Sequence, residues 1–228
     1  MKNKWLQQIL IILVSMLPAA YILKIWPSIP DIVPTHFNNA MEPNGYSSKS
    51  GLLAISSVLA AVSVLLYFLM EYIHKIDPKR ALQDKAPIFN VLGTGLALFF
   101  TAINFVAILM SINKGSVPKH SLDGLIGLLF VFLGVAMPKI KPNYFVGVRL
   151  PWTLSSDYNW RKTHELTGKL WLAGGILFTV LSLLLPVTAT HFLVPVFIPI
   201  LAGVPIVYSF ILFKKEQANP DIAKQEPV

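Results

Sequence analysis

The stretch NYFVGVRLPWTLSSDYNWRKTHELTGKLW, residues 143–171, is a polar segment in a chain that is otherwise rich in apolar residues. It carries two arginines, two lysines, one histidine, two acidic residues and three tryptophans. Long apolar runs lie before and after it, so its position is best understood as a loop between membrane spans. The number of apolar runs around this polar segment then determines the fold class. Their order determines the side of the membrane on which the segment lies.

The composition supports a membrane protein. Of the 228 residues, 54% are hydrophobic and 13% are charged, whereas soluble domains carry about 25% charged residues. The formal net charge is +8, but the basic residues cluster in short loops beside apolar runs, which indicates topology and not direct nucleic-acid binding. The absence of cysteine excludes disulfides, thiol catalysis and cysteine-ligated metals.

Six apolar runs are long enough, or nearly so, to cross a bilayer about 30 Å thick at a helical rise of 1.5 Å per residue. The predicted spans are approximately Trp5–Ile25, Gly51–Ile73, Phe89–Ile112, Leu122–Met137, Leu170–Leu185 and His191–Phe213. The first run resembles a signal peptide, but it continues past the candidate cleavage site, so we predict an uncleaved helix.

The lysine and arginine distribution predicts the orientation. With the N-terminus inside the cell, only four of the 19 Lys and Arg residues fall in outward segments, namely Lys24, Lys49, Lys114 and Lys119. We therefore expect both termini and residues 143–171 to be cytoplasmic, and the loop 27–50 to face outward.

The predicted fold class is an all-α polytopic membrane helical bundle with about six transmembrane helices in an N-in/C-in arrangement. We divide the chain into an N-terminal membrane region, 1–112, which has three spans and the outward loop 27–50. A second membrane region, 113–213, contains the cytoplasmic segment 139–169. A disordered cytoplasmic tail, 214–228, follows.

Within the cytoplasmic segment we predict an amphipathic helix before the fifth span. Pro151 disfavours helix at Leu150, and Ser155 or Ser156 is a suitable N-cap. Trp160, His164, Gly168 and Trp171 then fall on one helical face. Two interpretations stay open: the segment anchors the protein at the membrane surface, or it binds a ligand or partner.

The outward loop opens with three prolines, Pro27, Pro30 and Pro34, which favour an extended path. EPNG at Glu42–Gly45 predicts a turn with Gly45 at positive φ. The loop is either a stiff lid over the outer end of the bundle or a binding site that uses His36, Phe37 and Asn38.

Residues 143–164 resemble the signature of the SdpI family of bacterial membrane proteins. The matching residues are Asn143, Gly147, Arg149, Pro151, Trp152, Thr153, Leu154, Trp160, Thr163 and His164. The loop is similar to the outward loop of the domain that usually precedes that signature. Its matching residues are Pro34, Thr35, His36, Phe37, Asn38, Gly45 and Lys49.

The resemblance implies immunity against a secreted, hydrophobic peptide toxin. In the best-understood branch of the family it also implies a receptor that holds a cytoplasmic transcriptional repressor at the inner face. On this basis the candidate partner- or toxin-binding residues are Arg149, Trp152, Trp160, Thr163 and His164 inside, and His36, Phe37 and Asn38 outside. The resemblance implies a non-enzymatic protein without cofactor, metal or catalytic residues, whose partners are the toxin, the repressor and the lipid bilayer.

Two other functions stay open from the residues themselves. A small-molecule or ion transporter needs polar groups within its spans. The candidates are Glu71, Asn104 and Asp123, although Asn104 is better explained by an interhelical hydrogen bond. A membrane-embedded enzyme is less well supported, because the sequence has no HExxH or GxSxG motif.

Overall fold

The structure is a computed structural model that describes residues 4–77, 87–112, 117–219 and 222. The long helices are α1 (Lys4–Lys24), α2 (Lys49–Ile76), α3 (Pro87–Ile112), α4 (Ser121–Ala136), α6 (Asp157–Leu184) and α7 (Val187–Ala218). The shorter elements are η1 (Trp26–Ser28), β1 (Ile32–Phe37), β2 (Pro43–Ser48), η2 (Met137–Lys139) and α5 (Pro151–Ser155).

Six of the described helices are long and apolar enough to cross a membrane, and they correspond to the six predicted spans. Large apolar side chains such as Leu13, Leu65 and Leu184 are exposed on them, as expected for helices whose outer faces meet lipid. The predicted all-α polytopic bundle is confirmed, and the chain is a multi-pass membrane protein.

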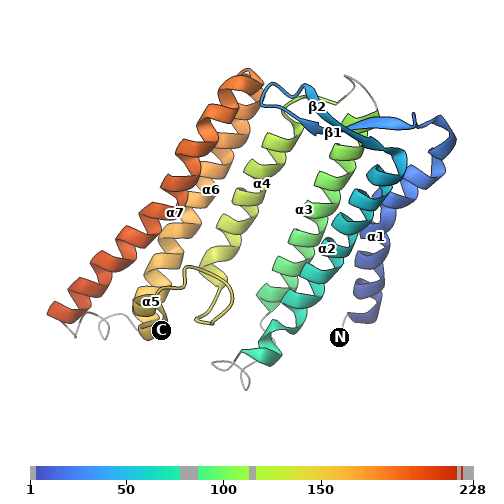
Figure 1. Ribbon diagram of the computed structural model, residues 1–228. Helices are drawn as coiled ribbons and strands as arrows, with labels where there is room; N and C mark the ends of the chain where they lie inside the picture. The colour runs from blue at the N-terminus through green and yellow to red at the C-terminus, as the bar shows by residue number, and fades with distance from the viewer. Residues whose placement is uncertain (1–3, 78–86, 113–116, 220–221, 223–228) are drawn as a thin grey trace.

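The helices form two groups along the chain, α1–α3 and α4, α6 and α7, which lie side by side (Figure 1). The β1–β2 hairpin lies at one end of the bundle, which we call the hairpin end. Residues 140–150, which we call the connecting loop, and α5 lie at the opposite end, the loop end. The two parts of the chain predicted to contact partners are therefore at opposite ends.

Helical periodicity places one face of each helix in the interior. On α3 the buried residues follow the helical repeat along one face, as Phe89, Leu92 with Gly93, Ala97, Thr101, Asn104, Ile108 and Ser111. The Asn104 side chain donates through Nδ2 to the carbonyl oxygen of Ser56 on α2 at 2.9 Å. This bond confirms the interhelical role predicted for Asn104.

Glycines allow α4 and α6 to pack with their backbones in close approach. A Cβ at Gly134 would overlap the Leu172 backbone, and one at Gly175 would overlap the Val131 backbone. Gly127 and Gly168 are similarly crowded by Thr179 and Pro138. This glycine seam holds together the two helices that the connecting loop joins.

The outward loop is a β-hairpin, and its turn is not where the sequence predicts it. Glu42–Gly45 does not form the turn, because Pro43–Gly45 belong to strand β2 and Gly45 is not among the residues at positive φ. The turn is built by Asn38, whose Oδ1 accepts hydrogen bonds from the N–H groups of Ala40 and Glu42, each at 2.9 Å. Met41 takes the left-handed conformation, with φ 57°. An asparagine side chain thus replaces the proline–glycine turn that the pattern indicated.

The predicted separate surface helix before the fifth span is also corrected. Helix α6 runs without interruption from Asp157 to Leu184, so the polar segment and the span are one helix. The predicted face is nevertheless present, with Trp160, His164 and Gly168 buried within the bundle. Much of the expected tail (220–221 and 223–228) and the basic residues Lys2, Lys79, Arg80, Lys85, Lys114 and Lys224 lie outside the described residues.

Candidate functional site

Asn143 shapes the first half of the connecting loop. Its Nδ2 donates to the carbonyl oxygens of Lys141 and Val146, both at 2.9 Å. Its Oδ1 accepts from the N–H groups of Phe145 at 2.8 Å and Val146 at 2.7 Å. Because this side chain is 1% exposed and uses both ends of its amide, it organises the turn without water.

His164 fixes the second half of the loop from α6. The Val148 N–H donates to His164 Nε2 at 3.1 Å. Since Nε2 accepts, a neutral ring carries its proton on Nδ1, which donates to the Trp160 carbonyl oxygen at 2.8 Å. Gly147 lies against this ring with φ 119°, and a Cβ there would overlap Nε2. The glycine of the sequence motif is thus explained by both its backbone conformation and its contact with His164.

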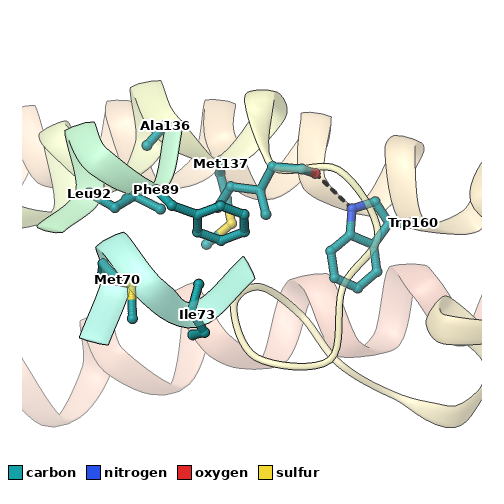
Figure 2. Packing of buried hydrophobic residues seen from close by; sticks show 8 residues of the cluster. Met70, Ile73, Phe89, Leu92, Ala136, Met137 and Trp160 are labelled. Atoms are coloured by element: carbon teal, nitrogen blue, oxygen red, sulfur yellow. Dashed lines mark hydrogen bonds between the residues drawn. The ribbon is translucent and has the colours of Figure 1, made fainter. Parts of the chain in front are cut away.

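Trp160 joins the loop end to the hydrophobic core. Its indole Nε1 donates to the carbonyl oxygen of Ile140 at 2.8 Å, and its ring stacks on His164 with centroids 4.1 Å apart. Figure 2 shows the ring beside a cluster that includes Met70 and Ile73 of α2 and Phe89 of α3. Trp160 is 1% exposed, so it is a core residue and does not serve as an interfacial anchor.

Two polar caps complete the loop and start the helices. The Thr153 hydroxyl donates to the Val148 carbonyl oxygen at 2.8 Å and accepts from the Leu150 N–H at 2.9 Å. Leu150 is extended, with ψ 154°, as predicted before Pro151. Ser156 is the N-cap of α6, because its Oγ accepts from the Asn159 N–H at 3.1 Å, which confirms the predicted cap.

Helix α7 packs against this region through several hydrogen bonds. Trp152 Nε1 donates to Ser209 Oγ at 3.0 Å, and Asn159 Nδ2 donates to the Ser209 carbonyl oxygen at 2.9 Å. The Ser156 hydroxyl donates to the Glu216 carboxylate. The start of α6 and the end of α7 are therefore connected at the loop end.

The candidate residues of the loop end differ in exposure. Trp160, Thr163 and His164 are at most 1% exposed, and Trp152 is half-buried against Phe210 and Phe213 of α7. Arg149 is exposed and donates through Nη1 to the Tyr144 carbonyl oxygen at 2.6 Å. Of these five residues, Arg149 is the one in the exposed class, while Trp160 and His164 are buried and hydrogen-bonded to the connecting loop.

A pocket of about 650 Å³ lies at the hairpin end. One wall is the hairpin, with His36, Phe37, Asn38, Asn39, Ala40 and Asn44. The other wall is the start of α7, with Thr188, His191 and Phe192. We call this cavity the hairpin pocket, and it brings together the three candidate residues of the outward loop.

Both walls of the hairpin pocket are held by hydrogen bonds. His191 Nδ1 bonds to the Asn39 carbonyl oxygen, and Lys119 Nζ donates to the Ala40 carbonyl oxygen at 3.2 Å. The Thr190 hydroxyl donates to Asp123 Oδ2 on α4 at 2.9 Å. The hairpin, α4 and α7 thus form a connected frame around the cavity.

The α7 wall was missed by the sequence analysis, because Thr188 precedes the predicted sixth span, whereas His191 and Phe192 read as its first residues. A signal was present, since Thr188, Thr190 and His191 form a short polar stretch soon after the break at Pro186. Asp123, at 5% exposure, has two partners on α7, because Thr190 donates to its Oδ2 at 2.9 Å and His191 Nε2 lies 3.8 Å from its Oδ1.

Comparison with known proteins gives matches over both regions. Residues 139–209 match the model of the SdpI/YfhL protein family, and residues 13–60 match a domain of unknown function (DUF1648). The Immunity protein SdpI of Bacillus subtilis (strain 168) is 27% identical over 122 residues, which are 53% of this chain and 57% of that protein. The matched part is thus little more than half of that relative. No solved structure matches the chain.

Proposed function

The chain is a member of the SdpI/YfhL family, and we propose that it protects the cell against a secreted toxic peptide that acts on the membrane. The similar protein from Bacillus subtilis carries the name Immunity protein. The observation that carries the proposal is the hairpin pocket, which adjoins membrane helices and combines aromatic and polar lining residues. Such a mixed cavity suits an amphipathic peptide better than a simple ion.

We propose the N-in/C-in orientation for the bundle, with the hairpin end outside and the loop end in the cytoplasm. The bias in basic residues supports it. This orientation exposes the hairpin pocket to a peptide that arrives from outside. We propose the division into regions 1–112 and 113–213, and the separate family matches at 13–60 and 139–209 support it. The tail predicted from residue 214 begins later, because α7 continues to Ala218.

A survival assay tests the function. A sensitive strain that produces the chain is challenged with the toxin peptide of the Bacillus subtilis immunity system and, as a control, with an unrelated pore-forming peptide. We expect protection against the first peptide alone. Phe192→Ala should reduce protection, whereas Tyr46→Ala, an exposed residue on β2 outside the pocket lining, should preserve it.

The proposal fails if the membrane-inserted chain gives no protection against the toxin. It also fails if protection extends equally to the unrelated peptide, because this would indicate a general change in the membrane. Protein levels in the membrane fraction of each variant separate loss of function from loss of protein.

A second candidate function is a receptor that holds a cytoplasmic transcriptional repressor. The observation in favour is the surface of the connecting loop, where Arg149, Tyr144 and Phe145 are exposed on a frame of buried residues. Arginine and aromatic side chains are enriched where proteins bind partners. We expect Arg149→Ala to abolish toxin-dependent transcription in the host while leaving survival unchanged; normal induction would exclude Arg149 from this role.

A further inference from the structure

We propose that the hairpin pocket binds an uncharged, extended peptide segment, with one apolar or aromatic side chain packed against Phe37 and Phe192. The peptide backbone is hydrogen-bonded by the side-chain amides of Asn39 and Asn44. This inference rests on the proposed function and names the chemistry of the toxin segment that the site takes.

The lining of the pocket argues against a charged ligand group. None of its nine described lining residues is Asp, Glu, Lys or Arg. The charged side chains of Glu42 and Lys119 lie outside this lining, where Glu42 accepts from Asn38 Nδ2 at 3.3 Å and Lys119 donates to the Ala40 carbonyl oxygen at 3.2 Å. A charge entering the pocket would lose water, and no Asp, Glu, Lys or Arg of the lining would pair with it.

Two asparagine amides are available to a ligand. Asn38 is committed to the turn through its bonds to Ala40 and Glu42. The side chains of Asn39 and Asn44, by contrast, make no hydrogen bond to another described residue, and both line the pocket. A primary amide donates and accepts at once, so it is complementary to a peptide group.

The strand register places Asn44 at an irregular position of the hairpin. Phe37 pairs with Pro43 and His36 pairs with Gly45, so Asn44 has no partner residue on β1. An extra residue of this kind forms a β-bulge, and bulges redirect a side chain next to a functional site. The irregularity in the hairpin therefore places an amide in the pocket wall.

The hairpin and α7 also supply the backbone and apolar parts of the site. Among the described residues the sheet has two strands, so the outer edge of each strand lacks a strand partner there, and an extended peptide can add to such an edge. The Phe192 side chain is 78% exposed at the rim, which leaves its ring available to cover an apolar side chain.

Hydrogen bonds hold the two walls of the site in a fixed relation. The contacts of His191 with Asn39 and of Thr190 with Asp123 fix the α7 wall relative to the hairpin and α4. A pre-formed site loses little conformational entropy on binding. The frame thus favours recognition of a short peptide segment over the folding of a loop around it.

Photo-crosslinking of the full chain in lipid nanodiscs tests the inference. The probe is the capped, uncharged peptide acetyl-Gly-Ser-X-Ser-Gly-amide, in which X is benzoylphenylalanine, and the competitors carry Phe, Asp or Lys at X. We expect labelling within residues 36–44 and 188–192. The Phe peptide should compete at about tenfold lower concentration than the charged peptides, which corresponds to one favourable interaction.

Variants test the roles of the named side chains. Asn44→Asp keeps the shape but adds a charge, and Phe192→Ala removes the apolar wall; each should reduce labelling about tenfold. Asn39→Ala, which leaves the strand register intact, tests the second amide independently and should also reduce labelling. Tyr46→Ala, on the same strand as Asn44, should label like the parent chain.

Labelling spread over the apolar helix faces, equal competition by the Asp and Lys peptides, or normal labelling of Asn44→Asp and Phe192→Ala would each overturn the inference. The survival assay separates it from the proposed function. Selective labelling without protection would support the peptide site and contradict the immunity function. Protection that survives Asn44→Asp, Phe192→Ala and Asn39→Ala places toxin recognition elsewhere.

Discussion

The indole Nε1 of Trp171 on α6 donates a hydrogen bond to the carbonyl oxygen of Leu201 on α7 at 2.8 Å. Pro205 lies four residues after Leu201 within α7, and proline has no N–H to complete the helical bond. Trp171 therefore supplies the donor that α7 itself lacks. This matters in a membrane, where no water satisfies a free carbonyl group.

Replacing Trp171 by Phe should lower the free energy of unfolding by about 1 kcal/mol beyond the loss of packing, because Leu201 loses its donor. Pro205→Ala restores a helical N–H. In that background the Trp171→Phe change should therefore lower the free energy of unfolding by a smaller amount. Unfolding by SDS titration in mixed micelles measures the double-mutant cycle. Equal costs in both backgrounds would show that the two residues are not coupled.

Gly147→Ala should disrupt the connecting loop. The new Cβ meets His164 Nε2, and the φ of 119° is unfavourable for alanine, so we expect a loss of about 2 kcal/mol or more. Gly203→Ala is the matched control, because its Cβ would meet no atom within 4 Å and alanine favours a helix. Limited proteolysis at the loop should increase for the first variant and not for the second.

Asp123→Ala should weaken protection although Asp123 does not line the hairpin pocket. The change removes the acceptor that holds Thr190 and leaves the α7 wall less constrained. Asp123→Asn retains an oxygen acceptor and should keep most of the protection. Survival at matched membrane levels measures both variants, and full protection by Asp123→Ala would mean that the α7 wall needs no anchor on α4.

Asp31 and Lys49, whose side chains lie 2.9 Å apart, form a pH-dependent contact beside the hairpin. The hydrogen bond and charge of Lys49 lower the pKa of the Asp31 carboxyl below its usual range. A lowered pKa means that this contact stabilises the folded state above about pH 4 and is lost as the pH falls further.

The contribution to stability is small, because Asp31 is exposed. The pKa of Asp31 is therefore a better quantity to measure than the change in stability. NMR of the Asp31 carboxyl carbon should give a pKa that rises toward the usual value in Lys49→Met. An unchanged pKa in that variant would remove Lys49 as the cause.

Much of the fold follows from local sequence rules. Apolar runs predicted the six spans, side-chain capping predicted Ser156, and helical spacing predicted the buried face with Trp160 and His164. These features depend on neighbouring residues, so a single sequence contains the information. The interhelical bond of Asn104 was predicted because an amide within lipid needs a partner.

The hairpin pocket could not be predicted in the same way. It forms where Asn44 and His191, far apart in the chain, meet across the hairpin end. The turn prediction was wrong because the Asn38 side chain builds the turn, so the turn lies earlier in the chain than the predicted Glu42–Gly45. The pairing register of the hairpin and the position of α7 depend on tertiary contacts. Neither produces a periodic pattern of residues in the sequence.

The glycine seam between α4 and α6 has a consequence for how natural variants should be interpreted. Gly134 and Gly175 lie in apolar helices, where hydropathy treats glycine and alanine as nearly equivalent, yet neither position has room for a methyl group. Under the proposed function, sensitive isolates with substitutions at either residue would resemble strains that had lost toxin recognition. Their defect would instead be in assembly of the bundle, so such alleles would report on protein abundance and not on the residues proposed to bind the peptide.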